Sequence, residues 1–171
     1  MQRTSLPLGM AQSSVDLDQM VGRNILLATD FSDFSARALR YALGIASRYE
    51  SQLYLFHCVD PTPYNFLFPG AVQTALDDAR LELERLVSDL RHEDRAKNLE
   101  IKIMIEAGDL AVILPKTVKD LDLALMVVGT HGRTGWRKTV LGSRPVGPHR
   151  VVFLPARLRA GTRRYRTLGS G

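Results

Sequence analysis

Four segments of the chain have the apolar patterns of β-strands. Residues 24–29 and 123–128 are short apolar runs, which are typical of strands buried on both faces of a sheet. Residues 52–59 are rich in aromatic and β-branched side chains, which favour strands. Residues 99–109 alternate apolar and polar positions. This pattern predicts a strand covered mainly on one side.

Helical periodicity fills the intervals between these strands. Apolar residues recur at three- and four-residue spacing at 35–49 and at 71–97, and a Gly-Asp turn and cap precede a third helix at 110–122. Pro115 removes a backbone hydrogen bond inside the third helix, so we expect that helix to be kinked or shortened. The order β-α-β-α-β-α-β predicts an α/β fold, in which an open, mostly parallel sheet of five or four strands has helices on both faces.

The chain has the size and composition of one globular domain. It contains 171 residues, of which 45% are hydrophobic and 24% charged, and no apolar run approaches the roughly 18–20 residues that span a bilayer. Residues 1–22 show no sustained period or signal-peptide pattern, and we expect a flexible leader there.

The single cysteine, Cys58, indicates a reducing compartment, so a cytoplasmic protein is the default expectation. Apolar side chains of the loop at 60–70 are expected to fold back on the domain or to cover a neighbouring site.

The basic charge of the chain is concentrated near its C-terminus. The formal net charge is +5, but residues 144–171 contain seven arginines and no Lys, Asp or Glu. The first 143 residues therefore hold 16 basic and 18 acidic side chains, a formal charge of −2. A nucleic-acid partner is consequently expected only through the basic tail.

A glycine-rich segment at 129–143 directly follows the last predicted strand. Ligands of open α/β sheets bind outside the carboxyl ends of strands, and glycines let the backbone approach an anion closely. Asp30 and Val59 end the first and second strands, so the fold brings all three strand ends to one rim. The segment lacks the lysine of a Walker loop, and no Gly-x-Gly-x-x-Gly follows the first strand. These positions predict a nucleotide site of another kind.

The spacing of Gly129, Gly132, Gly142 and Ser143 is Gly-x2-Gly-x9-Gly-Ser. Together with ILLATDFSDFSARAL near the start, it resembles the ATP-binding motif of the universal stress protein family, over about residues 23–143. The resemblance implies a single-domain member with an adenine-nucleotide-hydrolase-like fold. It also implies a regulatory, ATP-binding module of stress adaptation, often without clear turnover, that commonly forms a homodimer.

The resemblance further implies a set of nucleotide-binding positions. They are Ala28, Thr29, Asp30, Val59, Val128, Gly129, His131, Gly132, Gly142, Ser143 and Arg144. In this assignment Asp30 lies at the adenosine, Val59 touches the base, and Gly142 and Ser143 hold the phosphate chain with the backbone of Arg144. ATP with Mg²⁺ or Mn²⁺ is the expected cofactor.

The residues alone leave other interpretations open. A glycine-rich loop can be a tight connection, and Asp30 can be a helix cap in competition with Ser32, Asp33 and Ser35. Cys58 lies on a strand and is expected to be core rather than a nucleophile. No paired carboxylates, metal-spaced His/Cys cluster or nucleophile–base arrangement is apparent. A nucleotide-free scaffolding module and a slow ATP-hydrolysing enzyme are the alternative functions.

The chain departs from the family pattern after Ser143. Pro145, Gly147 and Pro148 disfavour the helix that the family pattern has there, whereas residues 150–155 can still form a last strand, and residues 156–171 are expected to be a disordered basic tail. The tail is a genuine extension, a degenerate end or the product of a shifted reading frame, and its Arg, Pro and Gly content favours the latter two. Loss of the helix would weaken anion binding, and loss of the strand would expose a sheet edge and weaken a dimer.

Overall fold

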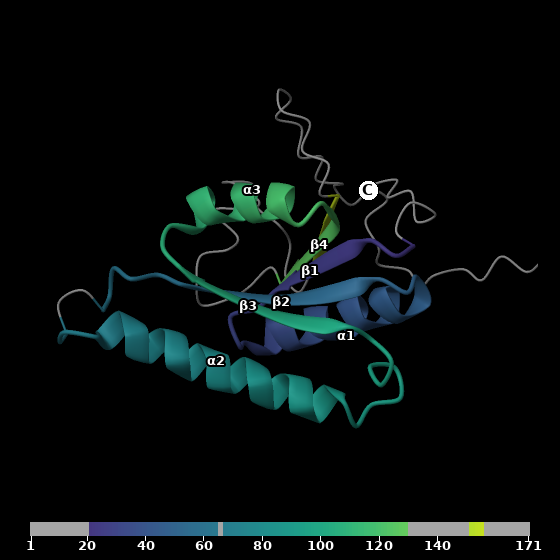
Figure 1. Ribbon diagram of the computed structural model, residues 1–171, viewed down its shortest axis with the longest axis horizontal. Coiled ribbons are helices and arrows are strands. Elements are labelled where there is room, and N and C mark those ends of the chain that lie inside the picture. Colours follow the sequence, from purple (N-terminus) through teal and green to yellow (C-terminus); the bar gives the residue numbers. More distant parts are fainter. Residues whose placement is uncertain (1–20, 65–66, 130–150, 156–171) are drawn as a thin grey trace, which may run out of the picture.

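The computed structural model describes residues 21–64, 67–129 and 151–155. These residues form one five-stranded sheet with the strand order β3-β2-β1-β4-β5 (Figure 1). In chain order the elements are β1 (Asn24–Ala28), α1 (Asp33–Arg48), β2 (Gln52–Val59), α2 (Ala71–Leu90), β3 (Ile101–Ala107), α3 (Leu110–Asp120), β4 (Leu123–Gly129) and β5 (Val151–Pro155). The strands β1 to β4 are parallel, and β5 pairs with β4 in the antiparallel direction. The predicted mostly parallel α/β sheet is therefore confirmed, and a last strand forms within the range left open by the sequence.

Helices cover both faces of the sheet (Figure 1). Helices α1 and α2 lie on one face, where Ile25 and Leu27 of β1 belong to one buried cluster. Helix α3 lies on the other face, where Leu26 and Ala28 belong to a second cluster. Successive strand residues point to opposite faces, so a central strand with two covered faces needs an unbroken apolar run. This explains why β1 and β4 lack alternation.

Strand β3 forms one edge of the sheet and follows the alternating pattern expected of it. Ile101, Ile103 and Ile105 pack against the cluster under α1 and α2, while Lys102 is exposed. The alternating sequence of β3 therefore indicates that the two faces of this strand are unequally covered.

Two helices are shorter than their predicted ranges. Helix α2 ends at Leu90 rather than near residue 97, because residues 91–95 are all exposed and contribute no apolar stripe. The chain then turns back, and Ala96 and Leu99 are buried in the core. Helix α3 runs from Leu110 to Asp120 with Pro115 at its centre, and it ends two residues before the predicted end. Pro115 deprives one carbonyl, four residues earlier, of its donor.

The loop before α2 differs from one of the two alternatives expected for it, that of folding back on the domain. Leu67 and Phe68 are 63% and 58% exposed, so these two side chains do not fold back on the domain.

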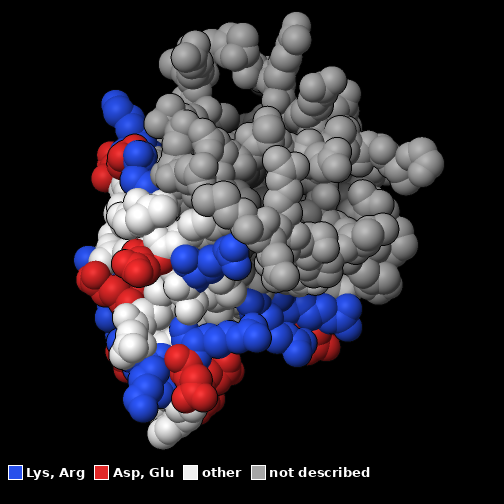
Figure 2. Space-filling model, turned by 90° about the vertical axis from the view of Figure 1, so that its right-hand side faces the viewer, with Lys and Arg blue, Asp and Glu red and all other residues white. Residues whose placement is uncertain are grey.

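Among the described residues, no helix has the length and apolar character required to cross a membrane. Figure 2 shows Lys and Arg beside Asp and Glu over the described part of one face, so both signs of charge are present there.

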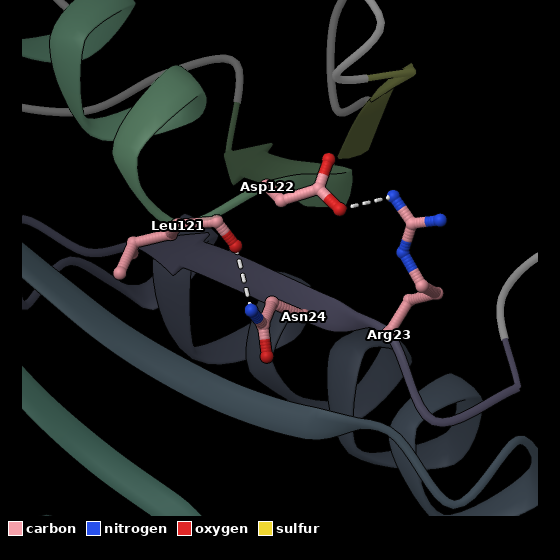
Figure 3. A network of polar contacts seen from close by, with 4 residues as sticks. All are labelled: Arg23, Asn24, Leu121 and Asp122. Carbon is pink, nitrogen blue, oxygen red and sulfur yellow. Dashed lines mark hydrogen bonds and ion pairs between the residues drawn. The ribbon is translucent and has the colours of Figure 1, made fainter.

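Polar contacts tie the amino end of β1 to the connection between α3 and β4 (Figure 3). Arg23 and Asp122 form an ion pair of 2.8 Å, with side chains 32% and 83% exposed. The Asn24 amide donates a hydrogen bond of 2.6 Å to the carbonyl of Leu121. These contacts hold the start of β1 beside the start of β4.

Candidate functional site

The predicted site residues at strand ends lie on both sides of a topological switch point. Strands β2 and β3 lie on one side of β1, whereas β4 and β5 lie on the other. Ala28 stands opposite Val128 of β4 and Phe56 of β2 in the register. Val59 ends β2, and Gly129 ends β4. The carboxyl ends of β1, β2 and β4 therefore share one edge of the sheet, where ligands of open α/β sheets bind.

Asp30 lies in the turn that leads from β1 to α1. Its carboxylate is buried, with 8% of the residue exposed. The Oδ1 atom accepts hydrogen bonds from the backbone N–H of Ser32 at 3.2 Å and from the Ser32 hydroxyl at 2.6 Å. Ser32 is the N-cap of α1, and its hydroxyl accepts from the backbone N–H of Ser35 at 3.3 Å. One interpretation of the sequence made Asp30 the helix cap, but the cap is Ser32. The Asp30 carboxylate instead holds Ser32 in place through the two hydrogen bonds.

Thr29 adds a second set of hydrogen bonds to the same turn. Its hydroxyl accepts from the backbone N–H of Phe31 at 3.1 Å and donates to the hydroxyl of Ser35 at 3.1 Å. The Ser35 hydroxyl in turn donates to the carbonyl of Ser32 at 2.8 Å. Phe31 has a φ of 60°, which is uncommon for a residue other than glycine. The turn is thus a defined structure rather than a loose connection.

His57 of β2 contacts this turn and was not among the predicted site residues. Its Nδ1 lies 2.8 Å from the carbonyl of Thr29, and because a carbonyl only accepts, Nδ1 is the donor. The imidazole also lies against the ring of Phe31, with 4.6 Å between centroids. Burial lowers the pKa of His57, although the hydrogen bond to Thr29 and the charge of Asp30 act in the opposite direction. The available signal was a histidine in an otherwise apolar strand, two positions before its end.

Gly129 has a packing function of its own. A Cβ atom at this position would lie 2.9 Å from the backbone carbonyl carbon and oxygen of Phe34 and 3.0 Å from the backbone nitrogen of Ser35. Only a glycine lets the first turn of α1 come this close to the end of β4. The observation supports the interpretation of Gly129 as part of a tight connection, and it places the start of α1 beside Gly129.

The structure describes one part of the predicted nucleotide site. This part contains Ala28, Thr29, Asp30, Val59, Val128 and Gly129, each of which is buried. The other positions lie outside the described residues: His131, Gly132, Gly142, Ser143 and Arg144. Within the described ranges, no group of three or more His, Cys, Asp or Glu side chains is placed to hold a metal ion.

Cys58 has the character of a core residue. It is 5% exposed and belongs to the cluster under α3. Burial, with the charges of Glu106, Asp60 and Asp109, raises the pKa of the thiol to about 11. The thiol is therefore protonated at neutral pH and is a poor nucleophile, as the sequence predicted.

Comparison with known proteins identifies the family. The model of the universal stress protein family matches residues 22–145. The chain belongs to this family. A universal stress protein of Methanocaldococcus jannaschii is 28% identical over 127 residues, which are 71% of this chain and 72% of that relative. A universal stress protein A homolog of Haemophilus influenzae is 28% identical over 131 residues, which are 72% of this chain and 87% of that relative.

A solved structure supports the same conclusion for the fold. The crystal structure of a universal stress protein family member from Burkholderia pseudomallei is similar to this chain with a TM-score of 0.52 and 25% identity. The match covers 72% of this chain and 91% of that one. The sequence-based identification of the universal stress protein family is therefore confirmed.

Proposed function

We propose that this universal stress protein binds ATP at the carboxyl ends of β1, β2 and β4 and acts as a regulatory module in stress adaptation. The observation that carries the proposal is the buried carboxylate of Asp30 at the switch point between β1 and β4. Buried carboxylates are uncommon unless hydrogen bonds hold them, and such groups concentrate at binding sites. A carboxylate is an acceptor for the hydroxyl groups of a ribose.

The described residues fit the adenosine end of the ligand. Asp30 would accept from the ribose, and the apolar side chain of Val59, at the end of β2, would contact the base. The phosphates would be held by the segment that begins at Gly129, where glycines permit close approach of backbone N–H groups. Mg²⁺ bound with ATP would take its ligands mainly from phosphate oxygens and water, which does not require a cluster of carboxylates.

Binding rather than rapid turnover is the proposed activity. The hydroxyl groups of Thr29, Ser32 and Ser35 all donate hydrogen bonds within the protein, and the thiol of Cys58 is protonated. These side chains are therefore engaged in fixing the turn or the core rather than poised as nucleophiles. Homodimerisation remains a prediction from the family resemblance, and a cytoplasmic location remains a prediction from the single cysteine.

Calorimetric titration of the full chain with ATP and MgCl₂ tests the proposal. Asp30→Asn keeps an oxygen that accepts from Ser32 but removes the charge, and we expect at least about tenfold weaker binding with a similar melting temperature. Asp33→Asn is the matched control, because Asp33 is an exposed carboxylate three residues away, and its affinity should stay within about twofold of wild type.

Two results would contradict this proposal. The first is wild-type protein that gives neither heat nor thermal stabilisation at millimolar ATP. The second is phosphate release at several turnovers per minute, which would favour the alternative of an ATP-hydrolysing enzyme.

A further inference from the structure

The turn that contains Asp30 depends on a contact from another strand. Phe31 adopts a left-handed conformation, with a φ of 60°, although it is not a glycine. Residues in such conformations persist only where their surroundings determine the backbone. The elements that determine it here are the hydrogen bonds of Thr29 and Ser32, described above, and the contacts from β2.

Two consecutive residues of β2 hold both backbone polar groups of Thr29. The N–H of Thr29 donates to the carbonyl of Phe56 at 2.9 Å, which continues the ladder between β1 and β2. The carbonyl of Thr29 then accepts from Nδ1 of His57 at 2.8 Å. A side chain thus supplies a donor at the point where β1 leaves the sheet and the chain turns toward α1.

The ring of His57 also contacts the residue after Asp30. It lies 4.6 Å from the ring of Phe31, with an angle of 33° between the planes. His57 therefore holds the residue before Asp30 through a hydrogen bond and the residue after it through ring packing. Burial lowers the pKa of the imidazole and so favours its neutral form, and the contacts with Thr29 and Phe31 act through geometry rather than charge.

We propose that His57 is a positioning residue for the nucleotide site. By fixing Thr29 and Phe31, it orients the carboxylate of Asp30 for the ligand, so that the site is formed before the nucleotide arrives. A site held in its bound geometry binds more tightly, because less ordering accompanies binding. The inference rests on the proposed ATP site and adds a residue that need not touch the ligand.

Two substitutions separate the contacts of His57. His57→Phe keeps a ring against Phe31 and removes the donor, whereas His57→Asn removes the ring and keeps a donor, because Nδ2 of asparagine stands as many bonds from the backbone as Nδ1 of histidine. We expect His57→Phe to weaken ATP binding about tenfold and His57→Asn to restore affinity to within about threefold of wild type. His92→Asn is the control, because His92 is exposed just after α2, and it should leave affinity unchanged.

A second measurement tests the turn without nucleotide. In ¹H–¹⁵N spectra of the free protein, the amides of Phe31 and Ser32 should shift or broaden more in His57→Phe, which loses the hydrogen bond to Thr29, than in His57→Asn, which loses only the ring contact. Phe31→Ala serves if His57→Phe does not fold, because Phe31 is 39% exposed and its truncation removes the ring contact from the surface. This variant should weaken ATP binding about threefold and shift the Ser32 amide.

The outcomes distinguish this inference from the proposed function. If wild-type protein does not bind ATP, the proposed function fails, and the free-protein spectra still decide whether His57 positions the turn. Unchanged Phe31 and Ser32 amides in His57→Phe, or an unchanged Ser32 amide in Phe31→Ala, would overturn the inference. So would equal loss of ATP affinity in His57→Phe and His57→Asn with the spectra unchanged, since His57 would then contact the nucleotide directly.

Discussion

The two ends of β1 are held by different kinds of polar contact. At the amino end, Arg23 pairs with Asp122 across an exposed surface, and Asn24 reaches the carbonyl of Leu121 (Figure 3). At the carboxyl end, Thr29 makes a buried hydrogen bond and Asp30 a part-buried one inside a turn with left-handed backbone at Phe31. Water competes with the exposed ion pair of Arg23 and much less with the buried hydrogen bond of Thr29. The amino end keeps two strands together, whereas the carboxyl end gives one backbone segment a defined shape.

The largest expected effect is at the carboxyl end, in Gly129→Ala. The new Cβ would meet the backbone of Phe34 at 2.9 Å, and backbone cannot move aside as a flexible side chain can, so we expect a loss of stability of up to about 3 kcal/mol. Urea unfolding followed by circular dichroism measures it. Gly44→Ala is the matched control, because Gly44 is in α1 with nothing within 4 Å of its Cβ position. Gly44→Ala should have the stability of wild type or be up to about 1 kcal/mol more stable. Equal stability of Gly129→Ala and Gly44→Ala would show that α1 and β4 are not in close contact.

Thr29→Val should have the next largest effect. The variant keeps the shape of the side chain but leaves the N–H of Phe31 without its acceptor from Thr29, and we expect a loss of about 1–2 kcal/mol. Thr117→Val is the control, since Thr117 is also buried but its hydroxyl only donates back to Ile113 within α3. Urea unfolding of both variants measures the difference. A smaller loss for Thr29→Val than for Thr117→Val would contradict the role given to the turn.

The pH dependence of stability tests His57. Its pKa in the folded protein is below the ordinary value of 6.5, so the unfolded chain binds more protons as the pH falls. The contribution of neutral His57 is therefore fully present above pH 6.5 and is lost as the pH falls below it. Unfolding in urea at pH 7.5 and 5.5 should show a larger loss of stability in wild type than in His57→Asn. An equal loss of stability in wild type and His57→Asn would mean that folding does not lower the pKa of His57.

The smallest effect is expected at the amino end, in Arg23→Gln. Asp122 is 83% exposed, so loss of the ion pair should change stability by less than about 0.5 kcal/mol. Thermal unfolding at low and high salt measures this change, and the small difference from wild type should shrink as salt rises. A loss as large as that of Thr29→Val would remove the contrast between the two ends of β1.

The fold could be predicted because strands that are covered on one face and strands that are covered on both have different sequence patterns. The central strands β1 and β4 are covered on two faces and have apolar sequences, whereas the edge strand β3 has an alternating sequence. The end of α2 at Leu90 was harder, because polar residues after it are compatible with both a helix and a turn. The antiparallel pairing of β5 with β4 depends on a contact between strands, which no local pattern contains.

The site was predictable at strand ends and less so between strands. Asp30, Val59 and Gly129 follow or end apolar strands, so their common edge follows from a parallel arrangement. His57 could not be assigned in the same way, because its role depends on a hydrogen bond to Thr29, 28 residues earlier in the chain. The assignments of His131, Gly132, Gly142, Ser143 and Arg144 stay predictions.

The most direct test of the ATP site maps the nucleotide onto the two ends of β1. Titration of the ¹⁵N-labelled full chain with ATP and MgCl₂, followed through backbone amide shifts, compares the two regions in one experiment. We expect saturable shifts at Asp30, Val59 and Gly129, with the amides of Arg23 and Asp122 unmoved. Shifts centred on Arg23 and Asp122, or no shifts at millimolar ATP, would contradict it.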